Sequence, residues 1–100
     1  MNKIKTIGFL VIIIFLLSAC GKKPEADFSW SPVEPVAGEE VKFTNLSQNA
    51  RSYSWNFGDM SIGSKANPVH VYKKSGRYIV DLRAHKGLLS DEKTVTIVVR

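Results

Sequence analysis

Three residues with the side-chain chemistry of a hydrolase triad occur close together in the sequence of this 100-residue chain. They are Asp59, Ser61 and His70. In an active triad the histidine takes the proton of the serine, and the carboxylate orients the imidazole. The serine of such a triad sits on a strained turn and needs a nearby loop of backbone N–H donors. The sequence around Ser61 has neither pattern, so we expect His70 to be a hydrogen-bonded histidine of the fold and expect no catalytic residue.

Acidic side chains are the second candidate for chemistry. Glu39 and Glu40 precede one predicted strand. Asp91 and Glu92 precede another. Hydrolysis of a glycosidic bond needs two carboxylates across a sugar-sized cleft, and a domain this small has little room for one. Calcium needs six to eight oxygen ligands, and no local run supplies them. We therefore expect solvated charges at these turns, no metal site, no cofactor and no enzyme activity.

The chain has one cysteine, Cys20, and the residues before it have the layout of an export signal. Lys3 and Lys5 come first, and the apolar run Ile7–Leu17 follows. This run is too short to cross a bilayer, which takes about 20 apolar residues. The ending Leu17-Ser18-Ala19-Cys20 resembles the lipobox of bacterial lipoprotein precursors. In that family a diacylglycerol is attached to the cysteine, and the peptide before it is removed.

The lipobox resemblance implies a signal peptide over residues 1–19, a lipidated Cys20 and a short tether over residues 20–26. Two or three acyl chains, such as palmitate, hold a protein stably on a membrane. Gly21 stands where an aspartate commonly retains lipoproteins at the inner membrane, so the resemblance favours the outer membrane of a bacterium. Removing residues 1–19, which carry two lysines and no acid, lowers the net charge from +5 to +3. This small excess forms no basic stripe, so we expect no nucleic-acid partner.

The residues after the tether alternate apolar and polar side chains, as half-buried strands do. The apolar positions are rich in aromatic and β-branched residues, and no stretch after Cys20 has helical periodicity. Turn residues recur about every 8–12 positions, which is typical of an antiparallel sandwich or barrel. The pattern therefore predicts an all-β domain over residues 27–100, built without a disulfide.

Four motifs follow one another within this domain. They are Val41–Ser47 (VKFTNLS), Tyr53–Asp59 (YSWNFGD), Asn67–Tyr72 (NPVHVY) and Gly76–Leu82 (GRYIVDL). Together they resemble the PKD (polycystic-kidney-disease) domain family, which implies an immunoglobulin-like β-sandwich of about seven strands. Met60 departs from the family pattern, which usually has a glycine there. A glycine suits a turn with positive φ, so Met60 implies a turn variant or strain.

Comparison with immunoglobulin domains implies how this core is pinned. Trp55 takes the place of the tryptophan on the third strand, and Val80 that of a disulfide cysteine. Phe43 is then the partner of Val80, and Phe57 joins the same core. Tyr78 takes the place of the tyrosine whose hydroxyl bonds to nearby backbone.

The alternation of apolar and polar residues says less about the turn that follows Phe57 and about the strand at residues 69–72. Gly58 and Asp59 form the turn, and we expect the Asp59 carboxylate to cap it through backbone N–H groups. Some PKD-like domains of bacterial collagenases resemble this turn and bind calcium, which we do not expect here. In the strand, apolarity alone favours the two valines inward, whereas the family pattern favours His70 and Tyr72. We predict the second register, and we expect His85 on the solvated face of its own strand.

Exposed aromatic residues would be the natural platform for a ligand. Trp30 and Tyr53 are the aromatic residues that the pattern commits least to the core. PKD modules are mostly accessory domains of cell-surface proteins. The resemblance therefore implies a lipid-anchored envelope protein whose domain is a non-catalytic module that binds an envelope protein or a glycan. The alternative is a structural spacer, or a remnant of a longer lipoprotein, with no ligand of its own.

Overall fold

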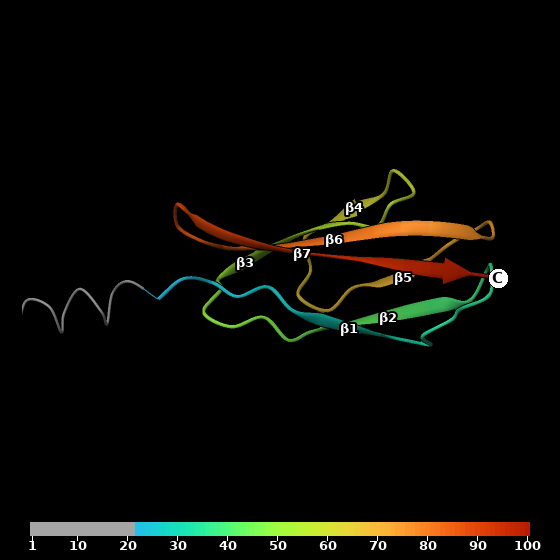
Figure 1. Cartoon of the computed structure of the whole chain (residues 1–100), viewed down its shortest axis with the longest axis horizontal. Helices are drawn as coiled ribbons and strands as arrows, with labels where there is room; N and C mark the ends of the chain where they lie inside the picture. Colours follow the sequence, from blue (N-terminus) through green and yellow to red (C-terminus); the bar gives the residue numbers. More distant parts are fainter. Residues whose placement is uncertain (1–21) are drawn as a thin grey trace, which may run out of the picture.

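The computed structural model describes residues 22–100, and this part of the chain is an all-β sandwich. Two antiparallel sheets face each other as layers (Figure 1). The first has the strand order β1-β2-β5 and the second β4-β3-β6-β7. The strands are β1 (Phe28–Ser31), β2 (Glu40–Asn45), β3 (Ser52–Asn56), β4 (Ile62–Gly63), β5 (Val69–Val71), β6 (Gly76–Lys86) and β7 (Leu89–Val99).

This architecture confirms the predicted immunoglobulin-like sandwich of about seven strands. The signal peptide predicted for residues 1–19 and the lipid site at Cys20 lie outside the described residues. Between residues 22 and 100, no helix has the length and apolar character needed to cross a bilayer.

The interior is filled by alternate side chains from both sheets. Four of these side chains are each at most 2% exposed: Phe43 from β2, Trp55 from β3, and Val80 and Leu82 from β6. The Phe43 and Trp55 rings lie 5.3 Å apart between centroids, and Phe57 belongs to the same buried cluster. Opposite Trp55 on β6 is Leu82 rather than Val80. Large aromatic rings give this small domain much of its buried area.

Three aromatic side chains also tie strand ends to loops through hydrogen bonds. The Trp55 indole donates to the Lys65 carbonyl oxygen at 2.8 Å. The Tyr78 hydroxyl donates to the Lys74 carbonyl oxygen at 2.7 Å, which is the backbone bond that the resemblance implies. The buried Tyr72 hydroxyl donates to the Phe57 carbonyl oxygen at 2.8 Å and so joins the end of β5 to the end of β3. Burial raises the pKa of Tyr72 well above its usual range, so this hydroxyl stays a donor.

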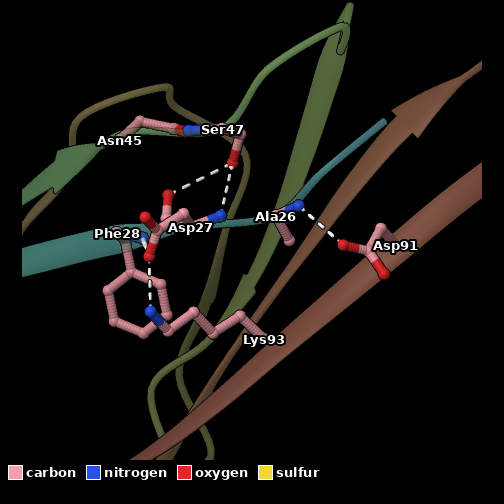
Figure 2. Close-up of polar contacts among 7 residues, drawn as sticks. All are labelled: Ala26, Asp27, Phe28, Asn45, Ser47, Asp91 and Lys93. Carbon is pink, nitrogen blue, oxygen red and sulfur yellow. Dashed lines mark hydrogen bonds and ion pairs between the residues drawn. The ribbon is translucent and has the colours of Figure 1, made fainter. Parts of the chain in front are cut away.

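The described part of the predicted tether, residues 22–26, is fastened to the sandwich. Pro24 is buried. Glu25 and Gln48 exchange two backbone hydrogen bonds of 2.9 Å. The Ala26 N–H donates to Asp91 Oδ2 at 2.8 Å (Figure 2). This attachment could not be predicted from the sequence, because it is made largely by backbone groups and one buried proline, which leave no periodic pattern.

Asp27 continues the attachment at the start of β1. Its N–H donates to the Ser47 hydroxyl at 3.1 Å, and its carboxylate forms an ion pair with Lys93 from β7 (Figure 2). Hydrogen bonding to Lys93 is the largest cause of the lowered pKa of Asp27. The entry of the chain is therefore held to both sheets.

Three strand assignments differ from the prediction. β2 begins at Glu40, so this residue lies within the strand and not before it. β7 begins at Leu89, so Asp91 and Glu92 lie within this strand and not before it. Both side chains are exposed near the start of this edge strand, where charged residues are tolerated and where apolar alternation does not reveal them. β4 was not anticipated, since its two residues, Ile62 and Gly63, are too few to show alternation.

Candidate binding groove on the four-stranded sheet

The outer face of the four-stranded sheet carries a polar groove. Strand alternation turns Ser54 and Asn56 of β3 and Asp81, Arg83 and His85 of β6 away from the core. Ser54 is paired with Arg83, and Asn56 with Asp81, across the two strands. These side chains line a groove of about 590 Å³, and β4 with the residue after it forms its wall.

The wall of the groove offers an apolar contact. Ile62 on β4 is 80% exposed, and Gly63 beside it contributes no side chain. β4 lies at the edge of this sheet and pairs with β3 through Asn56 and Trp55. The groove thus combines a polar floor with one apolar edge, the usual composition of a small-molecule or chain-binding site.

Hydrogen bonds across the strands hold the floor in place. The Ser54 hydroxyl and His85 Nε2 are hydrogen-bonded at 3.0 Å. Arg83 donates to the Glu92 carboxylate at 3.0 Å, and the Thr94 hydroxyl donates to Asp81 at 2.9 Å. Cross-strand pairs of this kind fix side-chain orientation on a sheet, so the groove is preorganised.

The charges of the groove are balanced within the protein. Burial raises the pKa of Asp81, and the neighbouring Glu92 carboxyl adds to this effect. The pKa of Glu92 is lowered, first by its hydrogen bond with Asp81 and then by Arg83. Since Arg83 already has a carboxylate partner, the groove suits an uncharged, hydrogen-bonding ligand better than an ion.

Asp59, Ser61 and His70 do meet, but not in the order of a hydrolase. His70 Nε2 lies 2.7 Å from Asp59 Oδ2, and the Ser61 N–H donates to Asp59 Oδ1 at 3.2 Å. An ionised carboxylate only accepts, so the proton between the two side chains is on the imidazole. The carboxylate lies between His70 and the serine backbone, where it caps the turn as we expected of Asp59. The imidazole nitrogen that would activate a serine is occupied by this carboxylate.

Packing holds the imidazole in the sandwich. The Phe57 ring stacks on His70 with centroids 4.3 Å apart, and Tyr72 contacts the imidazole edge-on at 4.7 Å. Tyr72 is buried and His70 half-buried, while the two valines of this strand are exposed, as in the register we predicted. Burial alone would raise the pKa of Asp59, but hydrogen bonds from His70 and from the Ser61 N–H outweigh it and lower the pKa.

The turn between β3 and β4 has positive φ angles at Gly58 (87°) and at Met60 (72°). A Cβ on Gly58 would lie 2.5 Å from the Ile79 carbonyl oxygen, so this position admits only glycine. The Met60 side chain is 99% exposed. Met60 therefore keeps the conformation that the usual glycine would adopt, and its side chain gains no packing in return.

The aromatic residues proposed as a binding platform lie elsewhere. Trp30 and Tyr53 are partly buried and pack against the core. The Trp30 indole donates to the Val33 carbonyl oxygen at 3.0 Å. Neither residue lines the groove. Sequence reasoning missed the groove residues because outward positions of any strand are polar. The residue types were the available signal. The outward positions of these adjacent strands include Asn, Asp, Arg and His, whereas an ordinary solvent-exposed sheet face carries mainly Ser, Thr and Lys.

Metal ligands do not gather in the described chain. Within residues 22–100, no group of three or more His, Cys, Asp or Glu side chains is placed to hold a metal ion. His85 and Asp81 face the same groove but are committed to Ser54 and Thr94.

Known proteins resemble most of this chain. A family profile described as the PKD domain matches residues 22–99. Collagenase ColA of Bacillus cereus is 38% identical over 74 residues, which is 67% of this chain and 8% of that protein. Collagenase ColQ1 of Bacillus cereus is 47% identical over 49 residues, or 46% of this chain and 5% of that protein. The chain thus spans less than a tenth of the length of these curated relatives.

Solved structures show the same relationship. The PKD1 domain of the Vibrio cholerae metalloprotease PrtV has a TM-score of 0.68 and 32% identity, covering 78% of this chain and 98% of that one. A structure from work on the promiscuous specificity of carbohydrate-binding modules of the β-sandwich superfamily has a TM-score of 0.72 and 32% identity, covering 78% of this chain and 34% of that one. Profile, relatives and structures agree: the chain belongs to the PKD domain family.

Proposed function

We propose that the protein is a non-catalytic binding module held at a bacterial envelope by lipid on Cys20, and that its groove takes a segment of glycan. The observation that carries the binding role is the preorganised polar groove on the four-stranded sheet. The similarity to a structure solved in work on carbohydrate-binding modules supports a glycan. That similarity covers 34% of the other chain, so it supports the class of ligand and not a particular sugar.

The chemistry of the groove favours hydroxyl-rich ligands over charged ones. Ser54, Asn56 and His85 offer donors and acceptors at fixed positions, and the charge of Arg83 is already paired with a carboxylate. The exposed Ile62 on the wall can cover the C–H face of a sugar ring. A polypeptide segment is the alternative occupant, since it too presents uncharged donors and acceptors.

Binding without catalysis fits the placement of the carboxyl groups. Glycosidases place two carboxyl groups on opposite sides of the scissile bond, about 5–9.5 Å apart. Asp81 and Glu92 instead are diagonal neighbours on β6 and β7, and they influence each other's protonation. The Bacillus cereus collagenase match covers 8% of that enzyme, which also supports an accessory role for this kind of domain.

A glycan array followed by calorimetry tests the groove. Arg83→Ala removes the charged donor on the groove floor, and we expect an affinity loss of about tenfold or more, as for a hydrogen bond to a charged group. Arg77→Ala is the matched control, because Arg77 is an exposed residue of the same strand outside the groove. Equal binding by both variants would contradict the proposed site. Glycan silence with a groove-dependent partner in an envelope pull-down would favour the polypeptide, and silence in both would favour the spacer.

The lipid anchor is tested separately. Cells that express the full chain are grown with a clickable palmitate analogue, and we expect label on the wild-type protein and none on Cys20→Ala. Label retained by Cys20→Ala would overturn the anchor without affecting the groove.

A further inference from the structure

The turn between β6 and β7 presents apolar side chains to solvent. Gly87 and Leu88 form a two-residue turn closed by Lys86 and Leu89. Gly87 has a φ of 60°, as the first central position of a tight hairpin turn often requires. Leu88 is fully exposed and Leu89 is 39% exposed. The turn geometry needs the glycine but has no need of a leucine at its tip, so the fold does not account for Leu88.

Basic residues surround this turn. Lys86 donates through Nζ to the Lys22 carbonyl oxygen at 3.2 Å, which places Lys22 and the adjoining Lys23 beside the hairpin. The Arg51 N–H donates to the His85 carbonyl oxygen at 2.8 Å, so Arg51 lies at the same end of the sandwich. The side chains of Lys22, Lys23 and Arg51 are exposed. Exposed leucines with Lys and Arg side chains around them are typical of a protein surface that binds the interfacial region of an anionic membrane.

Acidic residues in this region are set back from the tip. Glu25 follows the lysines along the chain, and Asp91 lies two positions into β7 after Leu89. The Asp91 carboxylate already accepts the Ala26 N–H (Figure 2). The leucine tip therefore faces outward with cations and not carboxylates beside it.

The attachment of the chain brings this end close to the proposed lipid. Residues 24–27 are fastened to the sandwich, and Figure 1 shows that the described chain begins at the end that carries the β6–β7 turn, opposite Arg100. Lys22 is the second residue after Cys20. Two residues of extended chain reach only about 7 Å. A lipid on Cys20 would hold this end of the sandwich against the bilayer.

We infer that the end formed by Lys22, Lys23, Arg51, Lys86, Leu88 and Leu89 docks on an anionic phospholipid surface. The leucines enter the interfacial region, and the basic side chains lie among the headgroups. This inference rests on the proposed lipid anchor and adds an orientation to it. The sandwich stands with its β6–β7 turn on the membrane, and its groove opens sideways along the sheet.

A fluorescent probe on the hairpin tests this orientation. The purified full-length lipoprotein is reconstituted into vesicles of phosphatidylcholine with or without phosphatidylglycerol. Leu88→Cys is labelled with an environment-sensitive thiol reagent, because the lipidated Cys20 has no free thiol. Met60→Cys is the matched control, since Met60 is 99% exposed and follows the opposite end of β3. We expect a blue shift and quenching by acyl-chain quenchers for the probe at position 88 alone, stronger with phosphatidylglycerol and weakened by salt.

Two readouts separate the inference from the anchor on which it rests. Flotation of the protein with the vesicles reports the anchor. If the protein floats but the probe at position 88 stays in water, or if both probes shift equally, the docking inference is wrong and the anchor stands. If the wild-type protein does not float, the anchor fails and the inference falls with it. A shift at position 88 only when envelope protein is added would show that the tip binds a polypeptide instead, which also overturns the inference.

Discussion

Replacement of Met60 by glycine should make the domain more stable, although Met60 is a larger and more apolar residue. Met60 has a φ of 72° and is 99% exposed. A side chain with a Cβ costs about 1–2 kcal/mol in this region of φ, because the Cβ crowds the following carbonyl oxygen. The exposed side chain recovers none of this through burial.

The expected gain is the difference between two opposing terms. Met60→Gly removes the steric cost of about 1–2 kcal/mol. Glycine has more conformational freedom in the unfolded chain, which costs about 0.5–1 kcal/mol. The net stabilisation is then about 0–1.5 kcal/mol, and its midpoint of about 0.75 kcal/mol raises Tm by about 3–6 °C for a domain of this size.

Thermal unfolding of the full-length protein in detergent, followed by tryptophan fluorescence, measures this gain. Met60→Ala is the control, because it removes the exposed side chain but keeps the Cβ, and its Tm should stay close to that of the wild type. The comparison of the Tm values of these two variants is decisive. If Met60→Gly melts no higher than Met60→Ala, the positive φ carries no cost here and the reasoning is refuted.

Three further predictions concern the core and the turn. Trp55→Ala should cost about 3–5 kcal/mol, seen as loss of cooperative unfolding by near-ultraviolet circular dichroism; a soluble variant with an unchanged melt would count against the core assignment. Gly58→Ala should cost at least about 2 kcal/mol, because its Cβ would meet the Ile79 backbone at 2.5 Å and the residue has positive φ; urea unfolding measures this, and a wild-type midpoint would contradict it. The pKa of Asp59 is lowered in the fold from 3.8, so its contribution is present above that value and is lost as the pH falls through the lowered pKa. Asp59→Asn should therefore be less stable than the wild type at neutral pH and lose this difference below about pH 4; a difference that is the same at pH 3 and pH 7 would exclude the titration of Asp59 as its cause.

The long strands could be predicted because alternation marks their buried residues directly. β2 and β6 show this clearly, with Val41 and Phe43 buried on one strand and Val80, Leu82 and Ala84 on the other. Alternation alone would have reversed β5, because its exposed residues are valines. The family pattern corrected this, since it specifies the tyrosine whose hydroxyl reaches across to β3.

The groove and the docked entry of the chain could not be predicted in the same way. The groove depends on register between β3 and β6, which pairs Ser54 with Arg83 and Asn56 with Asp81. A single sequence shows which residues point outward but not which of them become neighbours. The sequence predicts a hydrogen-bonded His70 but not its partner, because Asp59 and His70 come from segments of different sheets.

The fastening of residues 24–27 has a consequence for proteolysis of this segment. A protease needs several residues of extended, unpaired chain at the bond that it cleaves. Pro24 is buried, and Glu25, Ala26 and Asp27 have their N–H groups engaged by the sandwich. Proline after Lys23 also blocks enzymes of trypsin specificity at that bond. With the proposed lipid on Cys20, shedding of the folded domain is thereby restricted to cleavage before Pro24, and cleavage within residues 24–27 first requires local unfolding.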